Sequence, residues 1–153
     1  MGAGRHPKLL EPDAAAYIAG LIDGEGTVTL TRIHANECRR LVVSIANTEI
    51  QLLNFVIEQV GAGKITRKRT TCDLHTPSFC YAVTSQQALE LLRQVSPWMK
   101  SYKRLRAELA LERYTQLTPR NGKYTNKLLT LRREFEQELL SITAARAREP
   151  IAA

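Results

Sequence analysis

The spacing of apolar residues changes period several times along this chain, and those changes restrict the folds open to it. Helical spacing gives way to alternation of apolar and polar side chains, which is typical of half-buried strands. In chain order the pattern predicts a helix at 12–22, strands at 27–34 and 39–47, a helix at 49–60, strands at 64–70 and 78–85, and a helix at 86–95. The sequence therefore predicts an α+β fold of order αββαββα, with a four-stranded antiparallel sheet that carries helices on one face.

The remaining segments extend this unit at its C-terminal side. Helical spacing returns at 100–117 and at 125–142, on either side of a polar loop that contains proline and glycine. With 153 residues the chain is long enough for one domain with a substantial core. We therefore expect a domain at 12–143, preceded by a flexible arm at 1–11 and followed by a frayed tail at 144–153.

Composition narrows the classes of function. The formal net charge of +7 and the pI of about 9.6 suit a polyanionic partner such as nucleic acid, although charge alone does not identify one. The three cysteines lack CxxC spacing, so they indicate free thiols rather than a disulfide framework or a zinc site. No signal peptide and no apolar run of membrane-spanning length is present, which excludes a membrane partner on this pattern. We expect a soluble, intracellular protein of a bacterial or archaeal cytoplasm or of an organelle.

The face of the predicted sheet that carries no helices is rich in hydroxyl and basic side chains. A sheet that packs helices on one face exposes the other to water, so a plain solvated surface is one interpretation. A β-surface of hydroxyls and cations can also enter a major groove and contact base edges. The candidate DNA-binding residues are Thr27, Thr29, Thr31, Ile33, Arg40, Ser44, Lys64, Thr66, Arg67, Lys68, Arg69, Cys80 and Ala82.

The stretch YIAGLIDGEG, residues 17–26, ends a predicted helix on two carboxylates. Backbone carbonyls at a helix C-terminus carry partial negative charge, so a carboxylate there costs about 0.3–1 kcal/mol. Asp23 and Glu25 therefore violate the local charge rule, and such violations are expected at functional sites.

Small residues line the same helix. Ala15, Ala16, Ala19 and Gly20 recur at i, i+4 spacing, which allows two helix backbones to approach closely. If two copies cross here, their acidic ends converge, and a divalent cation between them would offset the repulsion. An alanine-rich helix packed on its own core would have the same composition.

The decapeptide and its surroundings resemble the LAGLIDADG homing endonuclease family. YIAGLIDGEGTV is similar to the family signature, and ANTEIQLLNFVIEQVGAGKI and YAVTSQQALELLRQVSPWMKSYKRLRAELALE resemble the corresponding later segments in the same order. The resemblance covers nearly the whole chain, roughly residues 14–140. It implies the family fold with a saddle-like sheet and extra C-terminal helices. The motif occurs once, and family members with one motif act as homodimers.

The resemblance also implies an activity and a cofactor. It implies a site-specific endonuclease that binds a long pseudo-palindromic double-stranded DNA target and makes a staggered break by metal-dependent phosphodiester hydrolysis. Mg²⁺ is the expected cofactor, with Ca²⁺ or Mn²⁺ as substitutes for binding or turnover. The family pattern assigns the metal to the Glu25 carboxylate, where many relatives carry aspartate, and to the Gly24 carbonyl.

Further roles follow from the same resemblance. The implied catalytic residues are Glu25, Asn47 at the end of the second strand, and Lys103, for which Lys100 is the rival; Asn47 serves equally well as a helix cap. The implied dimer interface is made by Ala15, Ala16, Ala19, Gly20 and Asp23. Asp23 is more suited to ordering the helix end than to binding metal.

Two other functions remain open within the same family. A maturase would bind intron RNA and assist splicing, and only in that case is RNA the partner. A non-catalytic regulator would bind DNA without cutting it. Glu25 is retained in this motif, which favours cleavage, and its substitution separates the three: only a nuclease would lose cutting while keeping binding.

Overall fold

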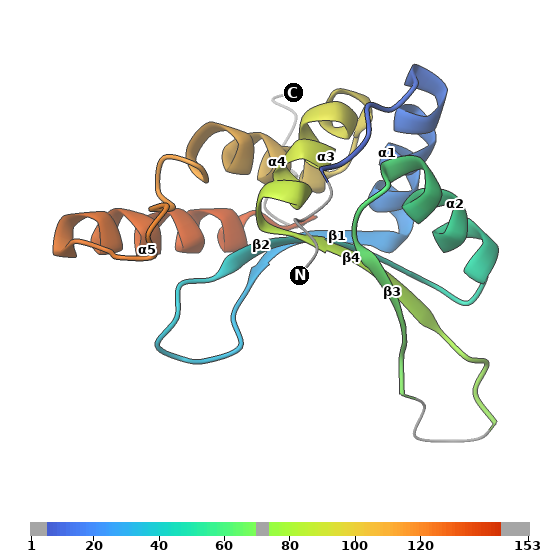
Figure 1. Ribbon diagram of the computed structural model, residues 1–153, viewed down its shortest axis with the longest axis horizontal. Helices are drawn as coiled ribbons and strands as arrows, with labels where there is room; N and C mark the ends of the chain where they lie inside the picture. The colour runs from blue at the N-terminus through green and yellow to red at the C-terminus, as the bar shows by residue number, and fades with distance from the viewer. Residues whose placement is uncertain (1–5, 70–73, 145–153) are drawn as a thin grey trace, which may run out of the picture.

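The computed structural model describes residues 6–69 and 74–144, and its elements follow the predicted order (Figure 1). They are α1 (Pro12–Glu25), β1 (Gly26–Thr31), β2 (Arg40–Asn47), α2 (Ile50–Val60), β3 (Lys64–Arg67), β4 (Phe79–Thr84), α3 (Ser85–Val95), the 3-10 helix η1 (Ser96–Trp98), α4 (Tyr102–Arg113) and α5 (Asn126–Ser141). The four strands form one antiparallel sheet in the order β1-β2-β4-β3. The predicted α+β fold, with its additional C-terminal helices, is confirmed.

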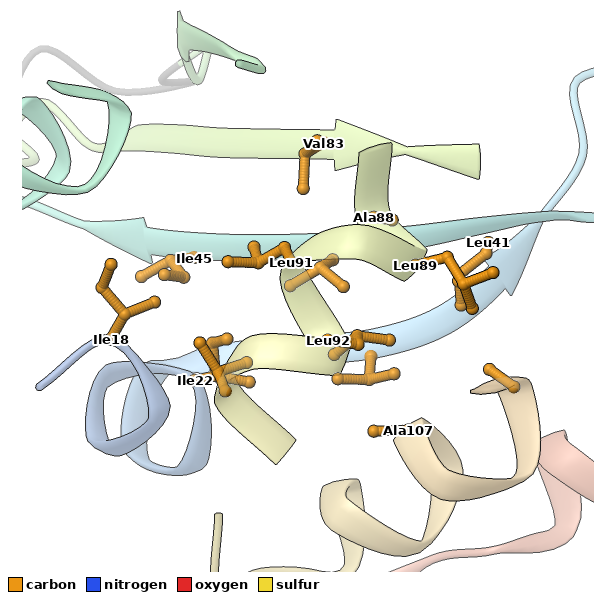
Figure 2. Close-up of a cluster of buried hydrophobic side chains, with 14 of the residues drawn as sticks. Ile18, Ile22, Leu41, Ile45, Val83, Ala88, Leu89, Leu91, Leu92 and Ala107 are labelled. Carbon is orange, nitrogen blue, oxygen red and sulfur yellow. The ribbon is translucent and has the colours of Figure 1, made fainter. Parts of the chain in front are cut away.

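The sheet separates a helical layer from an open face (Figure 1). The helices lie on one side of the sheet, and the β1–β2 connection bends away from them on the other. Alternate strand residues face the helices and are fully or almost fully buried; they include Val28, Leu30, Leu41, Val43, Ile45, Tyr81 and Val83. Figure 2 shows Ile45 near Ile18 of α1, and Leu91 of α3 over the same part of the sheet. The period of two in the strands therefore fixes which side chains remain on the open face.

The element boundaries differ from the predicted ones at points that affect the site. Helix α1 continues to Glu25 rather than ending at Ile22, so both carboxylates belong to its last turn. Strand β1 ends at Thr31, which places Ile33 in the β1–β2 loop with 73% of its surface exposed. Strand β3 ends at Arg67, so Lys68 and Arg69 follow it in the connection to β4.

The N-terminal segment is more ordered than the expected flexible arm at 1–11. The Leu10 amide donates to Gln94 Oε1 at 2.6 Å, and Gln94 Nε2 donates to the Lys8 carbonyl at 3.0 Å. The Lys8 amide donates to the Val60 carbonyl at 2.7 Å. Residues 6–11 therefore belong to the folded unit, while residues 1–5 and most of the expected tail lie outside the described residues. Within the described part of the chain, no helix combines the length and apolar character needed to cross a membrane.

Gly26 joins α1 to β1 without a linker. A Cβ atom on this residue would lie 2.6 Å from Ile22 Cα and 3.0 Å from the Ser44 carbonyl oxygen, both of which are backbone atoms. Only glycine allows the strand to leave the helix end and pair at once with β2, where Gly26 is opposite Ile45. The junction thereby holds the acidic end of α1 against the edge strand of the sheet.

Gly26→Ala is expected to lower the free energy of unfolding by about 3 kcal/mol, at the upper end for overpacking, because both close contacts are with backbone that cannot rotate away. Urea denaturation with a constant m-value would measure this. Gly122→Ala is the control, because a Cβ atom on Gly122 would meet nothing within 4 Å. Its φ of +69° adds a backbone cost that does not come from steric contact. We expect a cost of about 1–2 kcal/mol there, and equal costs at both glycines would contradict the steric argument.

Candidate functional site

The C-terminal end of α1 is stabilised by a lysine from α4. Lys103 Nζ donates to the Ile22 carbonyl at 3.0 Å and to the Asp23 carbonyl at 2.9 Å. These carbonyls belong to the last turn of α1, where the helix dipole places its negative end. The ammonium group therefore offsets the charge that makes this end unfavourable for Asp23 and Glu25.

Lys103 is also electrostatically linked to both carboxylates. Burial lowers the pKa of the Lys103 ammonium from its ordinary value, and the negative charges of Asp23 and Glu25 oppose that shift without cancelling it. Lys100, the rival residue, contributes its backbone amide to this region, and its side chain is exposed. The structure therefore brings Lys103, rather than Lys100, to the end of α1 through its side chain.

Asp23 is occupied within its own chain. Its carboxylate accepts hydrogen bonds from the Lys100 amide at 2.7 Å, the Ser101 amide at 3.1 Å and Ser101 Oγ at 2.5 Å. Ser101 is the N-cap residue of α4 and accepts from the Lys103 amide. Asp23 thus ties the end of α1 to the start of α4.

The same contacts set the ionisation of Asp23. Burial raises its pKa, but the hydrogen bonds from Ser101 and Lys100 outweigh this and hold the pKa below the ordinary value of 3.8. A carboxylate with a lowered folded-state pKa stabilises the protein above its unfolded-state pKa, and that contribution is lost as pH falls through the folded-state value. The contribution should therefore be complete at neutral pH and decline below about pH 4.

Asp23→Asn is expected to cost about 1–2 kcal/mol of stability at pH 7, at the low end for charged hydrogen bonds because Asp23 is partly exposed. The difference from wild type should shrink as pH falls below about 4, because the wild-type carboxylate is then protonated. Chemical denaturation from pH 7 to pH 2.5 would measure it. A difference that stayed constant with pH would show that the ionised form of Asp23 contributes nothing.

Glu25 and Gly24 lie exposed at the end of α1. Their carboxylate and carbonyl oxygens are the ligand types that Mg²⁺ and Ca²⁺ prefer. Among the described residues, no group of three or more histidine, cysteine, aspartate or glutamate side chains is placed to hold a metal ion. The carboxylate and carbonyl oxygens are therefore suitable ligands for a hard divalent cation. A full coordination shell would need further oxygens from outside this chain.

Asn47 lies at the same end of the sheet as Glu25. It is the last residue of β2, two residues beyond Ile45, which pairs with Gly26. Its Oδ1 accepts a hydrogen bond from the Glu49 amide at 2.8 Å, before α2 begins. Asn47 therefore uses its side-chain oxygen to bond the turn into α2, as the capping interpretation expects. Its position beside the end of α1 is compatible with a catalytic role, which stays a proposal.

The small residues of α1 divide between two faces. Ala15 and Ala19 are 4% and 0% exposed, packed inside their own protomer, so the expectation that they form a dimer interface is wrong. Ala16 is half-buried, and Gly20 and Gly24 are exposed. A Cβ atom on either glycine would meet nothing within 4 Å. Nothing within the described protomer therefore requires glycine at these two helical positions, where it costs about 1 kcal/mol relative to alanine.

The open face of the sheet brings most of the predicted DNA-binding residues together. One row crosses all four strands, because Thr27 pairs with Ser44, Ser44 with Ala82, and Ala82 with Lys64. Cys80 pairs with Thr66 in the next row, and Thr29 and Thr31 continue along β1, with Arg40 opposite Thr31. Ile33, Lys68 and Arg69 lie in loops instead. Arg67 pairs with Phe79, and its place in the alternation puts it on the face of the sheet that carries the helices. Its side chain is nevertheless exposed, at the rim of the sheet.

Sequence reasoning missed three members of this surface. Val42, Ala46 and Thr84 share the open face, since Val42 pairs with Thr29 and Thr84, and Ala46 pairs with Cys80. Strand alternation could have identified them, but their small or apolar side chains did not suggest polar recognition. Apolar contacts with the methyl group of thymine are a form of base recognition open to such residues.

Solved structures of similar architecture include homing endonucleases, whereas no family model and no curated protein matches the sequence. The homing endonuclease I-CvuI, solved in complex with its target in the presence of calcium, gives a TM-score of 0.69 at 17% identity, over 86% of this chain and 83% of that chain. The archaeal intron-encoded homing endonuclease I-Vdi141I, complexed with DNA, gives 0.59 at 17% identity, over 87% and 86%. The LAGLIDADG homing endonuclease I-GzeII, in complex with its DNA target, gives 0.65 at 14% identity, over 94% of this chain and 49% of that chain. The protein therefore has the fold of the LAGLIDADG homing endonucleases.

Proposed function

We propose that this chain is one subunit of a homodimeric, site-specific DNA endonuclease. The observation that carries the proposal is the end of α1. There Gly20 and Gly24, at which the protomer itself does not require glycine, share a face with the half-buried Ala16 and lead directly to the exposed carboxylate of Glu25. Two such helices crossing at the glycines would bring two Glu25 carboxylates together. The match to about half of the longer I-GzeII chain supports a site assembled from two copies.

Glu25 and the Gly24 carbonyl would hold Mg²⁺ at this meeting point, and Ca²⁺ or Mn²⁺ could replace it for binding or turnover. When bound, the cation supplies an activated water and neutralises charge on the scissile phosphate. Oxygens of the partner subunit and of the DNA phosphates would complete the donor set that a single chain lacks. The divalent charge would also remove the repulsion between the two carboxylates.

Lys103 and Asn47 would assist from within the same protomer. The ammonium of Lys103 keeps the helix end in place and adds positive charge beside Glu25, where a phosphodiester would develop negative charge during hydrolysis. Asn47 would orient water at the end of β2 while its Oδ1 holds the turn into α2. Asp23 would act only by positioning the last turn of α1 and the first turn of α4.

The open face of the sheet would lie in a major groove. The row from Thr27 to Lys64 offers hydroxyl and ammonium groups for base edges. Arginines at the rim and in the loops, among them Arg67 and Arg69, would contact phosphates and set the salt dependence of binding. Two subunits related by a two-fold axis would then read a long, pseudo-palindromic target.

A regulator of the same fold is the second candidate function. Binding by the open face does not need Glu25, so a protein that binds DNA without cutting it would use the same surface. The exposed Glu25 and the lysine that supports its helix end favour cleavage instead. A maturase would require an RNA partner, and no feature of the described residues points to RNA over DNA.

The test is a selection from randomised pseudo-palindromic duplexes. The protein would capture duplexes in Ca²⁺, Mg²⁺ would then be added, and new ends would be sequenced. Staggered cuts at the centre of an enriched site are the expected result. Enrichment without cuts in Mg²⁺ or Mn²⁺ would contradict the nuclease hypothesis and favour the regulator. Absence of any enrichment would favour structured RNA as the partner.

A further inference from the structure

An arginine and a glutamate of α5 lie in the interior beside the first residues of β2. Arg132 is 1% exposed and Glu136 is 8% exposed, and Arg132 Nε lies 3.6 Å from Glu136 Oε1. Burial of an ion pair is costly because both charges lose their hydration. A buried ion pair therefore adds little net stability by itself. The other contacts of Arg132 and Glu136 indicate what the pair does.

The pair binds both the amide and the carbonyl group of one residue. The Arg39 amide donates to Glu136 Oε1 at 2.6 Å, and Arg132 Nη2 donates to the Arg39 carbonyl at 2.6 Å. Two residues further on, the Leu41 amide donates to the hydroxyl of Tyr114 at 3.3 Å. Arg39 and Leu41 therefore direct their backbone groups to the same edge of β2.

These contacts pair with backbone groups of β2 that lie beyond the end of its neighbour β4. Pairing between β2 and β4 begins at Val42 and Thr84, so β2 extends past β4 at Arg40 and Leu41. An extended segment without a neighbour would leave backbone groups unpaired. Side chains of α5 and of Tyr114, the C-cap residue of α4, pair with them instead. The guanidinium of Arg132 is itself fixed by Thr118 Oγ1 at 2.6 Å and by the ring of Tyr114, with its centroid 4.6 Å away.

The β1–β2 loop also lies near α5. A cavity of about 270 Å³ separates the two; its lining includes Arg32, Cys38, Arg133 and Gln137. The contacts at Arg39 and Leu41 are thus polar attachments between the C-terminal part of the chain and the start of β2, and Tyr124, which precedes α5, adds a hydrogen bond with Cys38.

This attachment is at the far end of the open face from Glu25. Strand β1 begins immediately after Glu25 and ends at Thr31, six residues that span about 20 Å. The loop that follows, together with Arg39 and Arg40, would therefore meet the base pairs most distant from the cut. A change in the direction of this hairpin would displace those contacts more than contacts near Glu25.

We propose that the Arg132–Glu136 pair is a specificity-determining positioning pair that fixes the direction of the β1–β2 hairpin on DNA. The inference rests on the proposed DNA-binding function for its effect on the target. Its structural part, that the pair holds the hairpin in place, does not depend on DNA. Neither residue touches the reacting atoms, and both act through the backbone of Arg39.

The test compares Arg132→Met, Glu136→Leu and Glu136→Gln with wild type by two measurements. The first is amide hydrogen exchange in the free protein. In Arg132→Met we expect exchange about 10-fold faster over residues 31–41, although Arg132 bonds a carbonyl there and no amide, and unchanged exchange in β4. The second is selection in Ca²⁺ with discrimination resolved by position in the half-site. We expect discrimination to fall about 10-fold at the base pairs farthest from the centre and to remain near the cut.

Two variants separate positioning from general destabilisation. Glu136→Gln keeps an oxygen that can accept from the Arg39 amide, so its profile should lie closer to wild type than that of Glu136→Leu. Arg106→Met removes another buried arginine, which donates to the carbonyls of Val28 in the middle of β1 and of Leu140 and Ile142 rather than to the start of β2. It should lower stability without a selective loss at the distant base pairs.

The outcomes are distinct. Unchanged exchange over residues 31–41 in Arg132→Met and Glu136→Leu would overturn the structural part. Discrimination lost evenly along the half-site, or lost equally in Arg106→Met, would overturn the specificity role while the wild type still enriched its target. A wild-type protein that enriched no duplex would overturn the proposed function and the specificity role together.

Discussion

Glu25→Gln is expected to reduce strand cleavage by about 1,000-fold or more, which corresponds to about 4 kcal/mol of lost transition-state stabilisation. The amide keeps the size of the side chain but removes the charge with which Glu25 would hold a divalent cation. DNA binding in Ca²⁺ should weaken far less, because the open face of the sheet provides the base and phosphate contacts. Single-turnover cleavage of the selected target and a binding titration would give the two numbers separately.

The matched control is Glu49→Gln. Glu49 is an exposed carboxylate before α2, and its backbone amide donates to Asn47. Its replacement makes the same change of charge near the same end of the sheet, so it should leave cleavage within about 3-fold of wild type. A Glu25→Gln protein that cut at the wild-type rate would remove the basis for assigning metal to this carboxylate.

Gly20→Leu is expected to have opposite effects on the protomer and on the dimer. The new side chain meets open space within its own chain and replaces a poor helix former, so the separated protomer should gain up to about 1 kcal/mol in free energy of unfolding. Two helices that cross at this position would no longer approach closely, and self-association should weaken by about 100-fold or more, about 2.7 kcal/mol. Cleavage should fall with dimer content.

Sedimentation across a range of protein concentrations measures the association, and thermal unfolding at low concentration measures the protomer. Gln86→Leu introduces the same side chain at an exposed position of α3 and should leave association unchanged. If Gly20→Leu remained dimeric, the dimer interface would have to lie elsewhere on the protein. Glu25 would then not lie where the two subunits meet.

The fold could be predicted largely because strand alternation and helix spacing are local properties. The alternation in β1 and β2 correctly assigned Thr27, Thr29, Thr31 and Ser44 to the open face. The same signal failed at the end of β1, where Ile33 continues the alternation but lies in an exposed loop. An apolar side chain at the right spacing cannot show where a strand loses its partner.

The candidate site depended on contacts that no local pattern contains. The sequence predicted a helix that ends at Ile22, yet it continues to Glu25, and Lys103 and Ser101, about 80 residues away, stabilise its last turn. Alanine on both faces of α1 hid which face is buried, so Ala15 and Ala19 were misassigned. Arg132 and Glu136, spaced as an ordinary surface pair, gave no sign of their burial.

The absence of a linker at Gly26 has an evolutionary consequence. The carboxylate proposed to cut and the first side chain proposed to read DNA are separated by one residue whose conformation is fixed by backbone contacts. The distance along the duplex between the scissile bond and the nearest base pair read is then set by the chain itself. Lineages of such a protein would acquire new targets by exchanging side chains on the sheet, whereas an inserted or deleted base pair beside the cut would defeat recognition altogether.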